Sequence, residues 1–501
     1  MHPIWPSIEG FVAQYERAET QLVYTRMIND IDTPVSAYLK IAKGKPYAFL
    51  FESVQGGEQR GRYSFLGFDP DIVWRSHGEK VEISNGKADI KSSTFKSLDE
   101  KPLESLRALQ ARSSFILPDG IPPMAAGLFG YLGYDMIRHV EHLPHVNPDP
   151  IGTPDAIMSR PTLIAIFDQI AQEIIIATPV RPDPDTSAQT AYDDAQKRIL
   201  GITDSLSAPL PSPIGAKKQD TQITPKFGTT LSEFSQRVEK AKSYILAGDI
   251  FQVVIGQRLE APLLASPFSL YRALRRLNPS PFLYYLDFGD HHIVGSSPEI
   301  LVRLRGDKVT IRPIAGTRPR GKTQDEDIAH EASLLSDPKE RAEHLMLLDL
   351  GRNDVGRVAK SGSVCVTEKF IIERYSHVMH IVSNVEGDIR DDLDAFDALF
   401  AGFPAGTVSG APKVRAMQII DELEDEKRGI YAGAVGYISP EGEMDTAIAL
   451  RTGIIKDEKL HVRAGAGIVM DSVPESEYNE TLHKAAALFR AAEHSVNFEG
   501  N

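Results

Sequence analysis

The stretch from Ile311 to Arg357 constrains the fold of this chain more than any other, because it joins four structural signals in one place. It starts at the end of a β-branched run that predicts a short strand. Gly316 follows, where the backbone can approach a ligand closely. Beyond a basic loop, Asp337 is the expected N-cap of a helix, with Pro338 at its first position and Glu340 closing a capping box. A glycine turn and a capped helix around cationic side chains predict an anion-binding site.

Two predicted helices each present a pair of glutamates three residues apart, and residues at that spacing share one helix face. The pairs are Glu340 with Glu343, and Glu477 with Glu480 near the C-terminus. Carboxylates suit a hard cation, and Mg²⁺ typically takes one or two of them together with waters and substrate oxygens. Simpler interpretations stay open: first-turn acids complement the helix dipole, and Glu480 can pair with Lys484 one turn away. The spacing alone does not decide between them.

Four sequence strings resemble the signature blocks of anthranilate synthase component I, a family of chorismate-utilising enzymes. They are PIAGTRPRG, ERAEHLMLLDLGRND, AGTVSGAPKVRAM and the late GAG followed by SEYNET. The resemblance extends from about Glu52 to Arg490 and is densest from Phe251 onward. It implies an α+β fold with a large orthogonal β-sandwich flanked by helices, and a Mg²⁺-dependent attack on chorismate.

Composition and charge argue against several other classes of function. A net charge of −14 without any basic stripe argues against a nucleic-acid partner. The N-terminus lacks the basic start and apolar run of a signal peptide, and no window approaches about 18 uninterrupted apolar residues. Cys365 is the only cysteine, which rules out internal disulfides and fits a reducing compartment. We therefore expect a cytoplasmic protein that has no membrane partner.

The pattern of apolar runs divides the chain into three parts. Short strand-like runs with intervening helical segments predict an N-terminal α+β region over 1–203, which would also hold the regulatory site. Residues 204–230 are rich in proline, serine and polar side chains and predict a linker or loop. Residues 231–501 are the expected chorismate-binding catalytic domain. It opens with an amphipathic helix over 231–247, for which Ser232 is a candidate cap.

Carried over by matching strings, the resemblance implies a set of catalytic residues. Glu299, in the string Ser297-Pro298-Glu299, resembles the general acid that protonates the departing C4 hydroxyl of chorismate. His380, Thr407 and Gln252 resemble further active-site residues. Without the resemblance, His380 would be interpreted as a hydrogen-bonded core imidazole.

The same strings imply how the substrate and the metal are held. The chorismate-binding positions are expected to be Gly316, Thr317, Tyr431, Arg451, Gly465, Ala466, Gly467 and Lys484. Arg451 is expected to pair bidentately with a carboxylate of this dianion. Glu343 and Glu480 resemble the Mg²⁺ ligands, with Glu340 and Glu477 nearby.

The resemblance further implies the reaction of anthranilate synthase, the first step of tryptophan biosynthesis. Ammonia adds to C2 of chorismate, the C4 hydroxyl leaves, and elimination of pyruvate yields anthranilate. Relatives that make aminodeoxychorismate have lysine where this chain has Ala315, and water-adding isochorismate synthases carry a lysine near the position of Gln252. Two alternatives remain: an aminodeoxychorismate synthase component I, and a non-catalytic tryptophan-binding paralogue.

Nitrogen supply and feedback control are both expected to involve partners. Glutamine hydrolysis needs an activated nucleophile, and Cys365 lacks a glutaminase-like string around it. We therefore expect ammonia from a separate glutamine amidotransferase subunit within a hetero-oligomer. Two distant segments resemble the family's site for L-tryptophan, the expected inhibitor, whose ammonium group would meet Glu52. The inhibitor-binding residues are expected to be Glu52, Ser53, Arg62, Pro281, Phe282 and Leu283.

Overall fold

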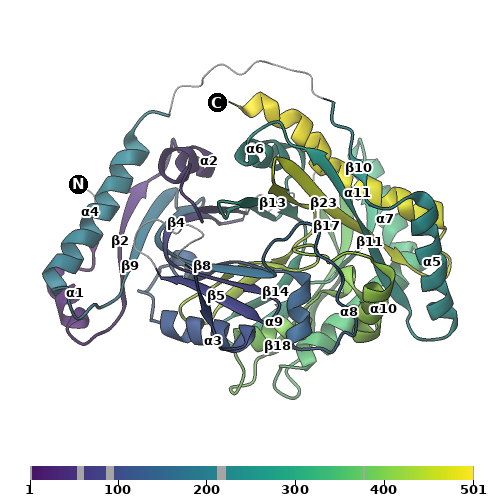
Figure 1. Ribbon diagram of the computed structural model, residues 1–501, viewed down its shortest axis with the longest axis horizontal. Helices are drawn as coiled ribbons and strands as arrows, with labels where there is room; N and C mark the ends of the chain where they lie inside the picture. The colour runs from purple at the N-terminus through teal and green to yellow at the C-terminus, as the bar shows by residue number, and fades with distance from the viewer. Residues whose placement is uncertain (1–2, 54–60, 86–94, 211–221, 376–377, 500–501) are drawn as a thin grey trace.

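The computed structural model describes residues 3–53, 61–85, 95–210, 222–375 and 378–499, and its helices lie mainly around a central sheet (Figure 1). The α-helices are α1 (Ile8–Tyr15), α2 (Pro34–Ala37), α3 (Pro102–Ser113), α4 (Ala188–Ser207), α5 (Leu231–Leu246), α6 (Pro267–Leu277), α7 (Gln324–Ser336), α8 (Pro338–Gly356), α9 (Ala395–Gly402), α10 (Lys413–Leu423) and α11 (Pro474–Ser495). A short 3₁₀ turn, η5 (Gly406–Val408), precedes α10.

The described strands belong to one sheet, and every strand pairing in the described ranges is antiparallel. The strands are β1 (Ile4–Trp5), β2 (Gln21–Ile28), β3 (Phe49–Glu52), β4 (Tyr63–His77), β5 (Lys80–Asn85), β6 (Phe95–Leu98), β7 (Leu128–Leu132), β8 (Ala156–Asp168), β9 (Glu173–Val180), β10 (Lys226–Phe227), β11 (Gln252–Pro262), β12 (Phe282–Asp287), β13 (His291–Ser297), β14 (Ile300–Arg305), β15 (Lys308–Ile311), β16 (Ile314–Pro319), β17 (Cys365–Arg374), β18 (Val378–Asp388), β19 (Gly410–Ala411), β20 (Ala434–Ile438), β21 (Met444–Ile448), β22 (Thr452–Lys456) and β23 (Lys459–Ile468).

The sheet folds into two layers with aromatic side chains between them. One layer runs through β3, β12, β13, β22, β23 and β11, and the other through β7, β20, β21, β14, β15 and β18. Phe49 of the first layer stacks on Phe129 of the second with ring centroids 4.7 Å apart, and Phe129 also stacks on Tyr437. Helices α2, α6 and α11 lie on one side of the layers and α3 and α9 on the other (Figure 1). The predicted α+β sandwich flanked by helices is confirmed.

Both predicted regions of the chain contribute strands to this sandwich. In the first layer β3 pairs with β12, and in the second β7 pairs with β20. Within the expected linker over 204–230, α4 continues to Ser207 and β10 pairs with β11, while residues 211–221 lie outside the described residues. The two regions therefore share one hydrophobic interior, and the proposed domain boundary stays a prediction.

The local signals at helix starts are partly correct. Asp337 caps α8 by accepting from the backbone N–H groups of Lys339 and Glu340, as its position predicts. The predicted capping box does not form, because Arg318 binds the Glu340 carboxylate instead. The expected helix over 231–247 is α5, but its cap is Thr230 rather than Ser232. The ion pair with Arg318 thus replaces the predicted capping-box contact of Glu340, and the Thr230 hydroxyl replaces that of Ser232 as the cap of α5.

Candidate active site

Glu299 and Arg451 lie at two adjacent corners where the chain passes from one sheet layer to the other. Strand β13 leaves the first layer and continues as β14 in the second, and β21 leaves the second layer and returns as β22 in the first. The corners are tied together: the Ser297 hydroxyl donates to the Ile448 carbonyl at 2.6 Å, and the Ile448 N–H donates to the Glu299 carbonyl at 3.0 Å. Such corners, made by strands that switch layers, belong to orthogonal sheet packing.

The Glu299 carboxyl group is held in its protonated form by burial. Its side chain is nearly inaccessible, with 4% of the residue exposed. Burial disfavours the charged form and raises the pKa of Glu299 to about 8, although hydrogen bonds from the Thr407 hydroxyl and the Ile314 backbone N–H act in the opposite direction. The Thr407 hydroxyl lies 2.9 Å from Glu299 Oε1. A carboxylic acid that keeps its proton at neutral pH can act as a general acid.

His380, on β18, lies opposite a bulge in the neighbouring strand β16. At this bulge the Gly316 carbonyl oxygen is close to the imidazole ring of His380. Thr317 is opposite His380 in the β16–β18 register, which shifts at Gly316, a residue with φ of +75°. His380 Nδ1 lies 3.0 Å from the Gly316 carbonyl, so Nδ1 carries the hydrogen. Burial lowers the pKa of His380. The ring is therefore neutral near pH 7, with the lone pair of Nε2 able to accept a proton.

Tyr375 is a member of this group that the sequence analysis missed. Its ring lies 5.5 Å from the His380 ring between centroids, and its hydroxyl donates to Glu373. Burial, and after it the Glu373 carboxylate, raises the pKa of Tyr375, and electrostatic interactions also link Tyr375 to Glu299 and Arg451. Nothing in the local sequence of Tyr375 marks it, because His380, Glu299 and Arg451 come from β18, the β13–β14 corner and the β21–β22 corner.

Arg451 presents a guanidinium group with no acidic partner. Its backbone adopts φ of +47°, which is uncommon for a non-glycine residue and fits its position at the corner. Burial lowers the pKa of Arg451. Within the described ranges, its side chain forms no ion pair and no hydrogen bond. An unpaired, partly buried guanidinium beside the Glu299 corner is suited to a bidentate carboxylate of a ligand.

The predicted metal-binding glutamates come together from α8 and α11. Burial raises the pKa of Glu343, and the neighbouring carboxylates of Glu340 and Glu480 raise it further. Glu340 is paired with Arg318 and Glu480 with Lys484 at 2.7 Å, whereas Glu343 has no ion pair among the described residues. Mutual repulsion of carboxylate oxygens is relieved by a cation, so this donor set fits Mg²⁺.

The protein's own ligands are too few to enclose a metal ion. Burial and the Glu480 carboxylate both raise the pKa of Glu477, so it belongs to the same acidic surface. Across the described part of the chain, no three histidine, cysteine or acidic side chains converge closely enough to hold an ion. A magnesium ion here would need water or substrate oxygens to complete its coordination.

The Gly465-Ala466-Gly467 segment lies within strand β23. Strand β23 continues to Ile468, and Gly465 to Gly467 pair with Gly256, Ile255 and Val254 of β11. The glycines leave room for side chains that cross the strand. A Cβ atom at Gly465 would lie 2.8 Å from the Tyr431 hydroxyl, and one at Gly467 would lie 2.5 Å from Gln252 Nε2. Lys484 Nζ donates to the Gly465 carbonyl at 2.9 Å.

Comparisons with known proteins identify the family of the chain. The family model of the chorismate binding enzymes matches residues 47–490. Anthranilate synthase component 1 of Cereibacter sphaeroides is 55% identical over 97% of each chain, and that of Pseudomonas putida is 50% identical over 92% of this chain and 93% of its own. The crystal structure of anthranilate synthase component I from Streptococcus pneumoniae superposes with a TM-score of 0.74 at 36% identity, covering 93% of this chain and 99% of that one.

The chain belongs to the anthranilate synthase component 1 family of chorismate-binding enzymes. The sequence-based assignment to this family is therefore confirmed, and with it the prediction of an anthranilate synthase-type enzyme. None of the described helices is long and apolar enough to cross a membrane.

Ala315 and Gln252, the two positions that the resemblance links to the choice of nucleophile, are both buried. Ala315 is buried in β16, directly before the Gly316 bulge. Gln252 is buried at the start of β11, and its amide is hydrogen-bonded to Glu343, while its Oε1 atom has no partner among the described residues. Neither position supplies an amine that could attack a substrate or activate a water.

The residues predicted to bind tryptophan line a separate cavity of about 410 Å³ between the two layers. Glu52 is fully buried, and its carboxylate accepts from Nε and Nη2 of Arg275 and from the Tyr271 hydroxyl. Its predicted role toward tryptophan stays a prediction. Asp445 also lines the cavity, and its Oδ1 atom is buried without a hydrogen bond among the described residues. The predicted residues lining the cavity are Glu52, Ser53, Arg62, Pro281, Phe282 and Leu283.

The raised pKa of Glu299 should be visible in the stability of the protein. In the unfolded chain this carboxyl group loses its proton near pH 4.5, and in the folded chain near pH 8. Between these values the folded state binds one more proton, so the group makes the free energy of unfolding fall as pH rises. We expect Glu299→Gln to remove this part of the slope in urea unfolding measured from pH 5 to 8. The exposed Glu441→Gln variant is the control, and parallel curves for Glu299→Gln and wild type would refute the assignment.

Proposed function

We propose that this chain converts chorismate and ammonia to anthranilate and pyruvate, the first step of tryptophan biosynthesis. The observation that carries the proposal is the pairing of a protonated Glu299 with an unpaired Arg451 at adjacent corners of the sheet. Chorismate is a dicarboxylate whose C4 hydroxyl must be protonated to leave as water. The two corner residues offer one carboxylate anchor and one proton donor.

The remaining residues fit the steps of this reaction. Arg451 orients a substrate carboxylate, and Glu299 donates its proton to the C4 hydroxyl as ammonia bonds to C2. The ammonium nitrogen then loses a proton, which restores the balance of charge. In the elimination that follows, the C2 hydrogen leaves as a proton and the bond between C3 and the ether oxygen breaks. The enolpyruvate that is released takes up a proton on its methylene carbon and becomes pyruvate. His380 Nε2 is a neutral acceptor beside this site, since Nδ1 is committed to the Gly316 carbonyl.

Magnesium binding by Glu343 and Glu480 is part of this proposal. The two carboxylates would hold the ion, and Mg²⁺ would supply charge neutralisation for the substrate. The Gln252 amide orients Glu343, and Lys484 orients Glu480 while remaining bound to the Gly465 carbonyl. These two contacts would fix the orientation of both carboxylates.

The identity of the product tests the proposed reaction directly. Purified chain with chorismate, Mg²⁺ and ammonium at mildly alkaline pH should form fluorescent anthranilate and an equal amount of pyruvate. Glu299→Gln should lower kcat by about 100-fold or more, because general acid catalysis typically contributes that much. A stable 4-amino product would place the chain with the aminodeoxychorismate synthases despite Ala315. Tryptophan binding without any turnover would favour the non-catalytic paralogue.

The magnesium site can be tested by titration. We expect Glu343→Gln to raise the Mg²⁺ concentration needed for half-maximal activity by about tenfold or more, since altered ligand shells typically cost 10- to 100-fold in metal affinity. Calorimetric titration of Mg²⁺ in the presence of chorismate should show the same loss. Asp349→Asn, an exposed change on the same helix, is the control. Unchanged Mg²⁺ dependence in Glu343→Gln would exclude it as a ligand.

We further propose that ammonia comes from a separate glutamine amidotransferase subunit. Cys365, the only cysteine of the chain, is exposed in β17 and lies on a different strand from the corner residues. The isolated chain should therefore use ammonium and not glutamine, and the complete enzyme would be a hetero-oligomer.

We also propose that the cavity lined by Ser53 and Pro281 binds L-tryptophan as an inhibitor. Its walls are largely aromatic and apolar, and the carboxylates of Glu52 and Asp445 are both part of its lining. A ligand there lowers activity only if it favours one conformation over another, and the coupling is reciprocal. Chorismate should therefore weaken tryptophan binding.

Ser53→Phe should fill part of this cavity. We expect at least about a tenfold loss of tryptophan affinity with basal ammonia-dependent activity retained, because a well-placed aromatic side chain excludes the indole ring. Binding would be followed by calorimetry and inhibition by anthranilate fluorescence. Ser333→Phe on the exposed face of α7 is the control. Equal tryptophan sensitivity in wild type and Ser53→Phe would contradict the proposed site.

A further inference from the structure

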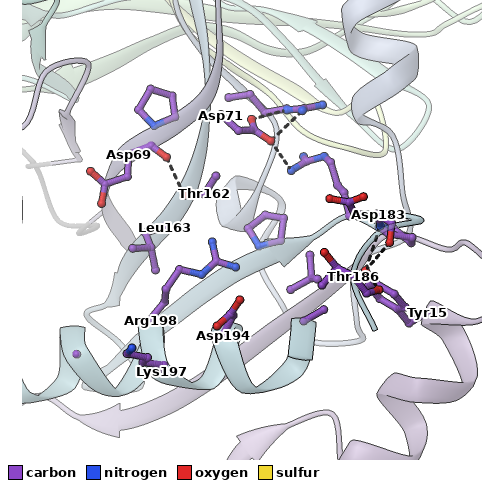
Figure 2. A pocket seen from close by; sticks show the side chains of 18 of the residues that line it. Tyr15, Asp69, Asp71, Thr162, Leu163, Asp183, Thr186, Asp194, Lys197 and Arg198 are labelled. Atoms are coloured by element: carbon purple, nitrogen blue, oxygen red, sulfur yellow. Dashed lines mark hydrogen bonds and ion pairs between the residues drawn. The ribbon is translucent and has the colours of Figure 1, made fainter. Parts of the chain in front are cut away.

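A second large cleft lies in the N-terminal region, away from the sites described above. It has a volume of about 1120 Å³ and is bounded by α4, the segment after β9, and the middle of β4 and β8 (Figure 2). It shares no lining residue with the tryptophan cavity and contains none of the proposed catalytic residues. Its volume is slightly above the range of about 300–1,000 Å³ that is usual for small-molecule sites.

The floor of the cleft is built around a bulge in the β4–β8 ladder. Pro70 pairs with Pro161 and Ile72 with Arg160, so Asp71 is an extra residue on β4. Bulges redirect a side chain out of the regular pattern. The Asp71 carboxylate accepts from Arg160 Nε and Nη2, both at 2.8 Å, and Arg181 Nη1 approaches it at 3.3 Å. One carboxylate thus positions two guanidinium groups.

Basic and acidic side chains line this cleft in equal number, but not every basic one is paired. The lining residues concerned are Arg160, Arg181, Lys197 and Arg198 on one side of this balance and Asp69, Asp71, Asp183 and Asp194 on the other. Arg181 keeps Nε and Nη2 buried without a hydrogen bond among the described residues, and burial lowers the pKa of Arg181 to about 10. Arg198 extends from α4 into the cleft, and its side chain makes no ion pair or hydrogen bond in the described ranges (Figure 2). Asp69 is paired with Lys45, and Asp194 is exposed at the rim.

We propose that this cleft binds a small organic oxyanion, a carboxylate or phosphate carried on an apolar body. Guanidinium donors that lack partners are satisfied by charged oxygens, which form stronger hydrogen bonds than neutral ones. The walls beside the guanidinium groups are mostly apolar, so an ion without an apolar body would leave them uncovered. These walls are formed by Pro46, Pro70, Leu163, Pro179, Val180 and Ile202.

Four probes separate the features of the proposed ligand. Calorimetric titration with benzoate and phenyl phosphate should show saturable binding, and the stronger of the two identifies the oxyanion. Inorganic phosphate should bind more weakly because it lacks the apolar body, and phenol should not bind because it lacks the anion at neutral pH.

Two variants place that binding in the cleft. Arg198→Gln should weaken the stronger probe by about tenfold or more, as the loss of a charge-assisted hydrogen bond predicts. Gly201 lines the cleft on α4 with open space beside its Cα atom, so Gly201→Leu should block the cleft without removing a charge. Leucine also favours the helix over glycine, which keeps this variant folded. Arg490→Gln, an exposed change on α11, should bind like wild type.

Three outcomes would overturn the proposal. The first is no saturable binding of either aromatic anion at millimolar concentration. The second is unchanged binding in Arg198→Gln and Gly201→Leu together with loss in Arg451→Gln, which would place the anion at the active site. The third is an equal loss in Arg490→Gln, which would indicate nonspecific attraction. None of these results bears on the formation of anthranilate, which is measured separately.

Discussion

The two adjacent corners at which the chain changes sheet layer are the constraint on which the candidate active site depends. A strand that turns from one layer into the other must place one or two residues between them, away from water. Glu299 occupies one such position and Arg451 the neighbouring one, and hydrogen bonds through Ser297 and Ile448 fix the distance between the corners. The chemistry assigned to these side chains follows from that placement.

The two halves of the chain are connected by strand pairing close to these corners. Strand β12 pairs with β3 from the N-terminal region and with β13, and Phe282 lies directly opposite Ser297 just before the Glu299 corner. The cavity proposed for tryptophan therefore borders the strand that carries the general acid. Removing either half would leave unpaired strand edges in both layers, because β3–β12 and β7–β20 are contacts between the halves.

Much of the local structure could be predicted from the sequence, but the long-range contacts could not. The Asp337 cap and the helix after Thr230 follow from short-range patterns, and the family strings predicted the fold class. The Glu52 carboxylate is bound by Arg275, which is remote from it in sequence. The neighbours of Tyr375 likewise come from separate parts of the chain. The GAG segment is extended and pairs with β11, and its glycine pattern does not reveal which strand lies beside it. The roles of the site residues stay predictions.

The most direct measurement is the pH dependence of kcat/KM for anthranilate formation in wild type and Thr407→Val. Glu299 acts as an acid only while protonated, so activity should fall above pH 8 in the wild type. The Thr407 hydroxyl lowers the pKa of Glu299 by hydrogen-bonding to its charged form, so removing it should move the falling limb to higher pH. A falling limb at the same pH in both proteins, or no limb near pH 8, would contradict the account of Glu299 as the buried proton donor.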